Sequence, residues 1–143
     1  MKATRNDIKK GAVLYYVSCI DGWRADRAKV RCSLEVTSEI RESLHNFGEN
    51  TSPLIIEYFE CNVNYIGLDW QNTDRRYLGD CGMGDGNYNL HRLFTTLESA
   101  VAFVEECHTG KFTDARDQDY YDRTITDEYI KRETAFHNEL SVQ

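Results

Sequence analysis

Apolar and polar side chains alternate strictly along Ala28-Lys29-Val30-Arg31-Cys32-Ser33-Leu34-Glu35-Val36. Alternation with a period of two is typical of a β-strand that buries one face and exposes the other. The pattern therefore predicts a half-buried strand, with Lys29 and Arg31 together on its outward face. The inward face would consist of Ala28, Val30, Cys32, Leu34 and Val36.

Other strand-like segments surround this one. Side chains that favour strands fill residues 13–17, 54–68, 75–78 and 88–94. Within 54–68 the apolar phase changes near Phe59-Glu60, which predicts a bulge or a sharp bend there. In the last segment, one face is expected to carry Tyr88, Leu90, Arg92 and Phe94.

A helix is predicted over about residues 96–108. Thr95 and Glu98 have the spacing of a capping box, and Gly110 provides a stop signal. Four apolar residues within it are spaced so that they share one helix face, which we expect to pack on the sheet: Leu97, Ala100, Val101 and Val104.

Two further helices are expected. One short helix is predicted within 38–47, where Ile40, Leu44 and Phe47 are spaced at i, i+4 and i+7. A last helix is predicted to start at Thr126, with Ile125 and Ile130 placed as a hydrophobic staple.

Strands followed by helices predict an α+β fold rather than alternating βαβ units. The expected architecture is a curved antiparallel sheet of five strands, or a small partly open SH3-like barrel, followed by two helices. Residues 1–110 would form a β-rich core domain with one packed helix. Residues 111–143 would form an acidic segment and a C-terminal helix.

Composition indicates a protein of a reducing compartment without a membrane span. The 143 residues carry a net charge of −7, and no apolar run is long enough to cross a bilayer. No secretory signal is visible. The expected location is the cytoplasm, that of the host cell if the protein is phage-encoded. Free thiols are expected because no pair has CxxC spacing among Cys19, Cys32, Cys61, Cys81 and Cys107.

No motif indicates catalysis, a metal site or a cofactor. The loop Gly79–Gly86 contains GxGxG, but a strand pattern follows it and no Gly-Lys-Ser/Thr is present. Asp80 and Asp85 would repel a phosphate, so a flexible hairpin loop is the simpler interpretation. None of the four histidines lies in a nucleophile motif. We therefore expect a non-enzymatic protein with no catalytic residue, no metal and no cofactor.

An acidic segment near the C-terminus suggests a protein-binding function. Carboxylates steer association with a basic protein face, and tyrosines are frequent binding hot spots. The expected partner is a host or phage protein with a basic face, although a solvated linker would have the same composition. The predicted binding residues are Asp114, Asp117, Asp119, Tyr120, Tyr121 and Asp122.

A basic and aromatic N-terminal region suggests an alternative function. Small barrels hold single-stranded nucleic acid by stacking bases on aromatic rings and pairing phosphates with cations. The same residues could instead serve as core tyrosines and solubilising edge charges. The residues of this alternative are Tyr15, Tyr16, Trp23, Arg24, Arg27, Lys29 and Arg31.

The run YLGDCGMGDGNYNLHRLFTTLESAVAFVEE, residues 77–106, resembles small proteins of tailed bacteriophages. In these proteins an opening like residues 8–17, IKKGAVLYYV, precedes a barrel-like sheet, and an HRLFTT strand leads into a capped helix. The resemblance implies an SH3-like barrel with an appended helix and a phage accessory role. The function we expect is therefore that of a phage accessory, host-takeover or counter-defence protein. The resemblance implies no catalytic residue, and it does not cover the chain beyond Thr113.

Overall fold

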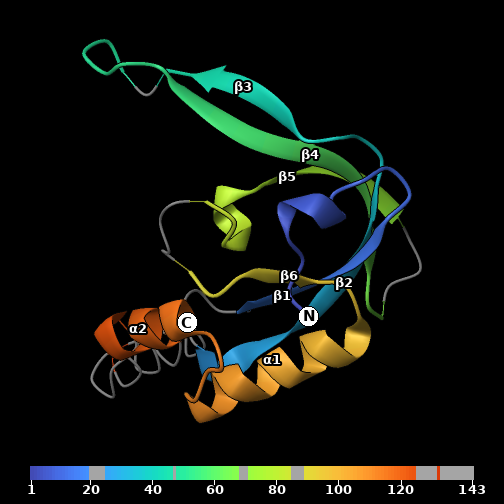
Figure 1. Cartoon of the computed structure of the whole chain (residues 1–143), viewed down its shortest axis with the longest axis vertical. Helices are drawn as coiled ribbons and strands as arrows, with labels where there is room; N and C mark the ends of the chain where they lie inside the picture. The colour runs from blue at the N-terminus through green and yellow to red at the C-terminus, as the bar shows by residue number, and fades with distance from the viewer. Residues whose placement is uncertain (20–24, 47, 68–70, 85–88, 125–131, 133–143) are drawn as a thin grey trace, which may run out of the picture.

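The computed structural model describes residues 1–19, 25–46, 48–67, 71–84, 89–124 and 132 (Figure 1). An antiparallel sheet curls into a half-barrel and is followed by two helices, which confirms the predicted α+β fold. Short 3-10 turns lie at Arg5–Asp7, Ala25–Arg27 and Gly79–Cys81. The six strands are β1 (Val13–Cys19), β2 (Ala28–Val36), β3 (Arg41–His45), β4 (Leu54–Tyr65), β5 (Gln71–Tyr77) and β6 (Arg92–Phe94).

The long strand β4 organises the sheet. The main strand order is β3-β4-β2-β1-β6, and β5 pairs with β4 outside this path. Residues 61–65 of β4 pair with β2, whereas residues 54–58 pair with β3. One strand therefore spans the curl and continues into a two-stranded extension formed with β3.

The apolar residues of β2 do not share one face as predicted, because a bulge interrupts the strand. Tyr16 pairs with Cys32 but Val17 pairs with Val30, so Arg31 is an extra residue in the ladder. As a result, Cys32 contributes to a cluster inside the curl and Val30 packs against a cluster on the opposite face. The alternation correctly predicted a strand, but the bulge divides its apolar residues between two cores.

The two apolar clusters lie on opposite faces of the sheet. The inner cluster fills the concave side, where the N-terminal segment and the 3-10 turn at residues 79–81 close it. It comprises Ala3, Ile8, Leu14, Cys32, Leu34, Val36, Phe59, Cys61, Val63, Leu78, Cys81 and Leu93. The outer cluster joins the sheet to the helices and comprises Val17, Ala25, Ala28, Leu90, Phe94, Ala100, Phe103, Cys107 and Tyr120.

Two predictions about the middle of the chain are corrected by the structure. Residues 41–45 form strand β3 rather than part of a helix, because Leu44 pairs with Ile55 in the ladder with β4. Of the bulge or bend predicted near Phe59-Glu60, the bulge does not occur, because β4 keeps an unbroken register with β5 from Tyr58 to Asn64. On its other edge, β4 changes partner at this point, from β2 at Cys61 to β3 at Tyr58. Phe59 faces the inner cluster, whereas Tyr58 on the other face packs 6.1 Å from the ring of Tyr77.

Helix α1 (Leu97–Thr109) confirms the predicted helix but not its buried face. Its N-cap is Thr96, which accepts the backbone N–H of Ser99 at 3.1 Å, one residue later than the predicted capping box. The residues that pack inward are Ala100, Phe103 and Cys107, because the aromatic ring of Phe103 fills the outer cluster. Two members of the predicted stripe are instead exposed, Leu97 by 48% and Val101 by 54%.

Helix α2 (Ala115–Thr124) forms within the segment predicted to be acidic and exposed. Figure 1 shows α1 and α2 together on the outer side of the sheet. The helix predicted to begin at Thr126 lies outside the described residues. Over the part of the chain that the structure describes, every helix is too short or too polar to cross a bilayer.

Candidate protein-binding surface

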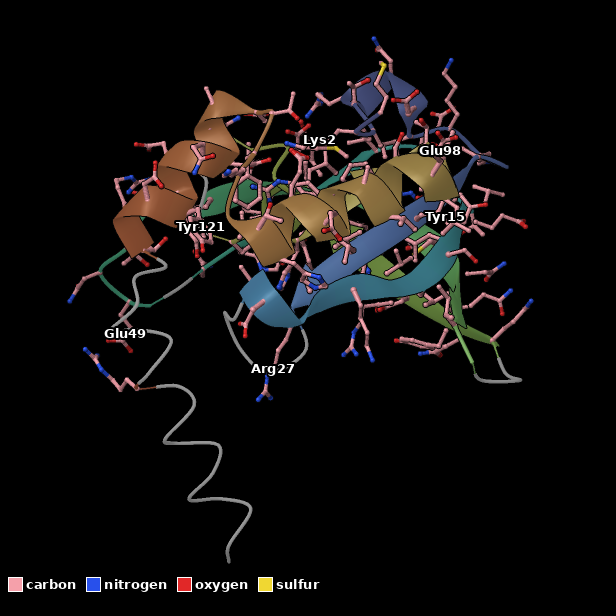
Figure 2. All side chains as sticks on the ribbon, turned by 90° about the horizontal axis from the view of Figure 1, so that it is seen from below. Lys2, Tyr15, Arg27, Glu49, Glu98 and Tyr121 are labelled. Atoms are coloured by element: carbon pink, nitrogen blue, oxygen red, sulfur yellow. The ribbon has the colours of Figure 1, made fainter. Side chains whose placement is uncertain are left out.

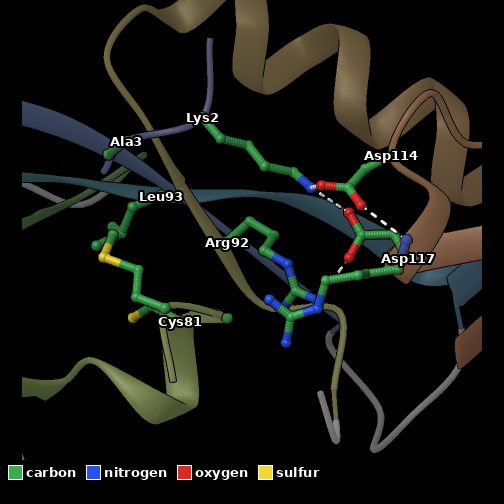
Figure 3. A pocket seen from close by; sticks show the side chains of 10 residues that line it. Lys2, Ala3, Cys81, Arg92, Leu93, Asp114 and Asp117 are labelled. Atoms are coloured by element: carbon green, nitrogen blue, oxygen red, sulfur yellow. Dashed lines mark hydrogen bonds and ion pairs between the residues drawn. The ribbon is translucent and has the colours of Figure 1, made fainter. Parts of the chain in front are cut away.

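Arg92 and Asp117 form a buried ion pair between the sheet and α2. Arg92 Nη2 donates to Asp117 Oδ1 at 2.7 Å, and the two side chains are only 4% and 2% exposed. Lys2 contacts the other carboxylate oxygen of Asp117 (Figure 3). A buried charge needs such partners because it has lost its hydration. This cluster therefore holds α2 against β6 and the N-terminal segment.

Further contacts hold the Arg92 guanidinium in place. Its Nη1 donates to the carbonyl of His91 at 2.6 Å and to Asn89 Oδ1 at 3.1 Å. Gly82, at φ +79°, lies so close that a Cβ there would approach the guanidinium to 2.6 Å. The adjoining cavity of about 60 Å³ has room for water but not for an organic ligand. This cluster is consequently a structural support.

Asp114 lies at the edge of the same cluster, just before α2. Its carboxylate accepts from Lys2 Nζ at 3.0 Å and from the backbone N–H of Arg116 at 2.8 Å. The hydrogen bond from Lys2 lowers the pKa of Asp114 below its ordinary value. The side chain is 43% exposed. A binding partner would therefore meet Asp114 as a carboxylate already paired with Lys2.

Both tyrosines of the predicted binding segment take part in packing. Tyr120 is only 7% exposed and belongs to the outer cluster. Tyr121 lies between the helices (Figure 2), with its ring centroid 5.5 Å from that of Phe112. It also packs on Gly110, at φ +74°, where a Cβ would come within 2.7 Å of the ring. Tyr120 is thus unavailable as a surface contact, and Tyr121 is half-buried.

The exposed part of the predicted acidic segment is narrow. Asp119 and Asp122 are exposed on α2, where Asp119 pairs with Arg123 at 2.9 Å and Asp122 accepts from Gln118 Nε2 at 3.1 Å. Asp117 is neutralised inside the protein and adds no surface charge. The segment is therefore a packed helix rather than a solvated linker, and its exposed carboxylates already have partners within the helix.

Exposed aliphatic and acidic side chains lie together on the outer side of α1. Leu97, Val101 and Glu105 are spaced at i, i+4 and i+8, so they follow one side of the helix. Glu98 and Ala102 are exposed beside them. Contiguous aliphatic groups rimmed by polar groups are typical of interaction surfaces. We call this surface the α1 face, defined as Leu97, Glu98, Val101, Ala102, Glu105 and Glu106.

A groove of about 450 Å³ adjoins the α1 face. Its walls come from α1, β6, the N-terminal segment and the chain before α2. Phe94 and Phe103 provide apolar surface, while Glu106 and Asp114 provide carboxylates. A space of this size accommodates one or two large side chains of a binding partner. The lining residues are Met1, Lys2, Phe94, Ser99, Ala102, Phe103, Glu106, Thr113 and Asp114.

The structure separates the residues of the nucleic-acid alternative. Tyr16 packs against the inner cluster, and its hydroxyl lies 3.2 Å from His91 Nδ1. Tyr15 packs against the outer cluster on the opposite face, so these two rings cannot stack on neighbouring bases. Lys29 is exposed, whereas Arg31 at the bulge and Arg27 are half-buried. Trp23 and Arg24 lie outside the described residues.

Several polar side chains lie around Tyr16 on the concave side of the sheet. Arg76 lies 5.1 Å from the centroid of the Tyr16 ring and forms an ion pair with Asp74. Burial raises the pKa of Tyr16 far above its ordinary value and lowers the pKa of His91. Burial also raises the pKa of Cys81 to about 12, which makes its thiol a poor nucleophile at neutral pH. These shifts favour neutral side chains in the interior.

The sequence contained a partial signal for the Arg92–Asp117 pair. Arg92 is predicted to share one strand face with Leu90 and Phe94, and an arginine that is buried between apolar residues requires a partner. The partner could not be identified, because Asp117 lies 25 residues away in a run that contains several aspartates of similar surroundings. Among the described residues, no three His, Cys, Asp or Glu side chains come together as a metal site would require.

These features define a small α+β protein with a curled sheet, two helices on its outer side and an acidic, partly apolar helical surface. The chain belongs to the phage g100-like protein family, whose model matches residues 2–107. The match includes the sheet and most of α1 but ends before α2. Comparison with curated proteins and with solved structures gives no match.

Proposed function

We propose that this phage protein is a non-enzymatic protein-binding module that docks on a host or phage protein through the α1 face. The observation that carries the proposal is the exposure of Leu97 and Val101 beside Glu98 and Glu105. An aliphatic side chain that is half exposed on a packed helix leaves apolar surface in water, and binding a partner would remove it.

Charge suggests the chemistry of the partner. The protein has a net charge of −7, and the α1 face carries the carboxylates of Glu98, Glu105 and Glu106. A partner surface with aliphatic or aromatic side chains flanked by lysine or arginine would complement both features. Electrostatic steering would accelerate the encounter, so the association rate should fall as ionic strength rises.

This proposal keeps the partner class predicted from the sequence and moves the contact surface. The predicted site was centred on α2, where Asp117 and Tyr120 are buried. Asp119 and Asp122 remain exposed on α2 and would extend the acidic surface around the α1 face.

Affinity capture from a bacterial lysate tests the proposal. The protein is compared with Glu98→Lys/Glu105→Lys and with a control, Glu35→Lys, which reverses an exposed charge on β2. We expect wild type and the control to retain the same protein and the double variant to lose it. Equal retention by all three, or no retained protein at low salt, would contradict the proposal. Retention of nucleic acid alone would favour the alternative function.

A further inference from the structure

Strand β3 and the first half of β4 form an arm that extends away from the curled sheet (Figure 1). Three of the most exposed aliphatic side chains of the described residues lie on this arm: Leu44 is 67% exposed, Ile55 is 65% and Leu54 is 56%. Leu44 and Ile55 are direct partners in the ladder and therefore lie side by side on one face. The arm thus presents an aliphatic pair that the described part of the chain leaves uncovered.

The outer edge of β3 is also available for pairing. β3 ends the strand order, and no other strand of the described chain pairs with that edge. Proteins usually protect such edges with charged side chains, proline, a bulge or a covering element. Strand β3 is charged at Arg41 and Glu42, but its second half, Ser43-Leu44-His45, has no lysine, arginine or carboxylate. The strand also has no proline, and its register with β4 is regular.

The sequence of β3 is suited to antiparallel pairing with a second copy. A two-fold axis through Leu44 would place Leu44 opposite Leu44, Ser43 opposite His45 and Glu42 opposite Asn46 of the other copy. The aliphatic pair would then become a continuous row of four side chains across four strands, because Ile55 flanks Leu44 in each copy.

The two neighbouring registers, centred on Ser43 and on Glu42, are less favourable. An axis through Ser43 would oppose Arg41 to His45 and the carboxylate of Glu42 to Leu44. An axis through Glu42 would oppose two carboxylates directly, and like charges in that position destabilise a sheet. The Leu44 register opposes no charges of equal sign among the paired residues 42–46 of the two copies.

We propose that the protein forms a two-fold symmetric dimer in which the β3 edges of two copies pair antiparallel about Leu44. The interface is isologous, since each copy contributes the same strand and the same Leu44–Ile55 pair. It lies on the arm, apart from the α1 face, and is independent of the proposed function. Because only one short strand and two aliphatic side chains per copy take part, the interface is small and the dimer should dissociate on dilution.

Sedimentation velocity over about 1 to about 200 µM protein tests the dimer. We expect the mass to rise from 16.6 kDa toward twice that value with concentration. Leu44→Lys should raise the dissociation constant at least about tenfold, because it would oppose two ammonium groups at the axis. The control Val101→Lys adds the same charge to the α1 face and should leave the dissociation constant of the dimer unchanged. A monomer at every concentration, or equal effects of the two variants, would overturn the proposal.

Cysteine crosslinking tests the register. In wild type, four of the five cysteines, Cys32, Cys61, Cys81 and Cys107, are buried, and the yield of covalent dimer from wild type under mild oxidation is the baseline. Leu44→Cys should give a disulfide-linked dimer, because directly opposed residues of antiparallel strands approach closely enough for a disulfide. Val101→Cys is the matched control and should give none. Absence of the covalent dimer from Leu44→Cys, or equal yields from both variants, would overturn the Leu44-centred register.

Discussion

The Arg92 guanidinium lies 2.7 Å from the Asp117 carboxylate, and both side chains are almost inaccessible to water. Arg92 belongs to β6, within the segment that matches the phage family, whereas Asp117 belongs to α2 beyond it. The pair therefore attaches α2 to the family core. It also removes the most central carboxylate of the predicted binding segment from the surface.

Removing the negative partner of this pair should destabilise the protein strongly. Asp117→Asn leaves Arg92 buried opposite a neutral amide, and breaking a buried pair in this way costs about 3–5 kcal/mol. The measurement is urea unfolding followed by circular dichroism. The control Asp119→Asn removes an exposed carboxylate of the same helix and should change the unfolding free energy by less than about 1 kcal/mol. Similar losses of unfolding free energy in both variants would contradict a stabilising role of the buried Arg92–Asp117 pair.

Replacing both charged partners should restore much of the lost stability. Arg92→Met combined with Asp117→Leu substitutes apolar side chains for the buried charges, and such replacements are often neutral or stabilising. The double variant should therefore unfold at a higher urea concentration than Asp117→Asn. A double variant less stable than Asp117→Asn would show that the neighbours of the pair, such as Lys2 and Asn89, require its charges.

Mild acid should weaken the fold through His91. Burial lowers its pKa below the ordinary value of 6.5. Below pH 6.5 the unfolded chain therefore binds a proton that the folded protein resists, and the unfolding free energy falls with pH. The slope for one such group is at most about 1.4 kcal/mol per pH unit.

His91→Gln isolates this contribution. Between about pH 7 and about pH 5, its unfolding free energy should change less than that of wild type, because the titrating group is gone. The readout is the difference between the two pH profiles from urea unfolding. Parallel profiles would show that His91 does not titrate differently in the folded and unfolded states.

The cysteines should react mainly after unfolding. Burial raises the pKa of Cys61 to about 11 and that of Cys81 to about 12, and Cys32 and Cys107 are also buried. Thiolate is the reactive form, so these four thiols should resist a disulfide reagent at about pH 8 in the native protein. Thiol titration in denaturant without reductant should detect five free thiols per chain. Rapid native reaction of two or more thiols, or a denatured count below five, would contradict this prediction.

Local sequence patterns predicted where strands and helices form better than they predicted which of their faces is buried. Alternation identified β2, and Gly110 correctly ended α1. The bulge at Arg31 could not be predicted, because a bulge is defined by pairing with another strand. Residues 41–45 have a weak helical spacing, but pairing of Leu44 with Ile55 decides in favour of a strand.

The predicted binding site differs from the structure for a related reason. A run of aspartates and tyrosines looks solvated when only its neighbours in sequence are considered. Asp117 is buried because Arg92 and Lys2, both distant in sequence, neutralise it. Tyr120 is buried because α2 packs on the outer cluster. Burial here depends on tertiary partners, which no local pattern in the sequence specifies.

Site-specific photocrosslinking in phage-infected bacteria tests the α1 face most directly. A photoreactive amino acid replaces Val101, 54% exposed on α1, or, as the control, Val13, 49% exposed on β1. If the α1 face docks on a protein, position 101 should give a discrete adduct that contains a second protein, and position 13 should give none. No adduct from position 101, or the same adducts from both positions, would contradict the central claim.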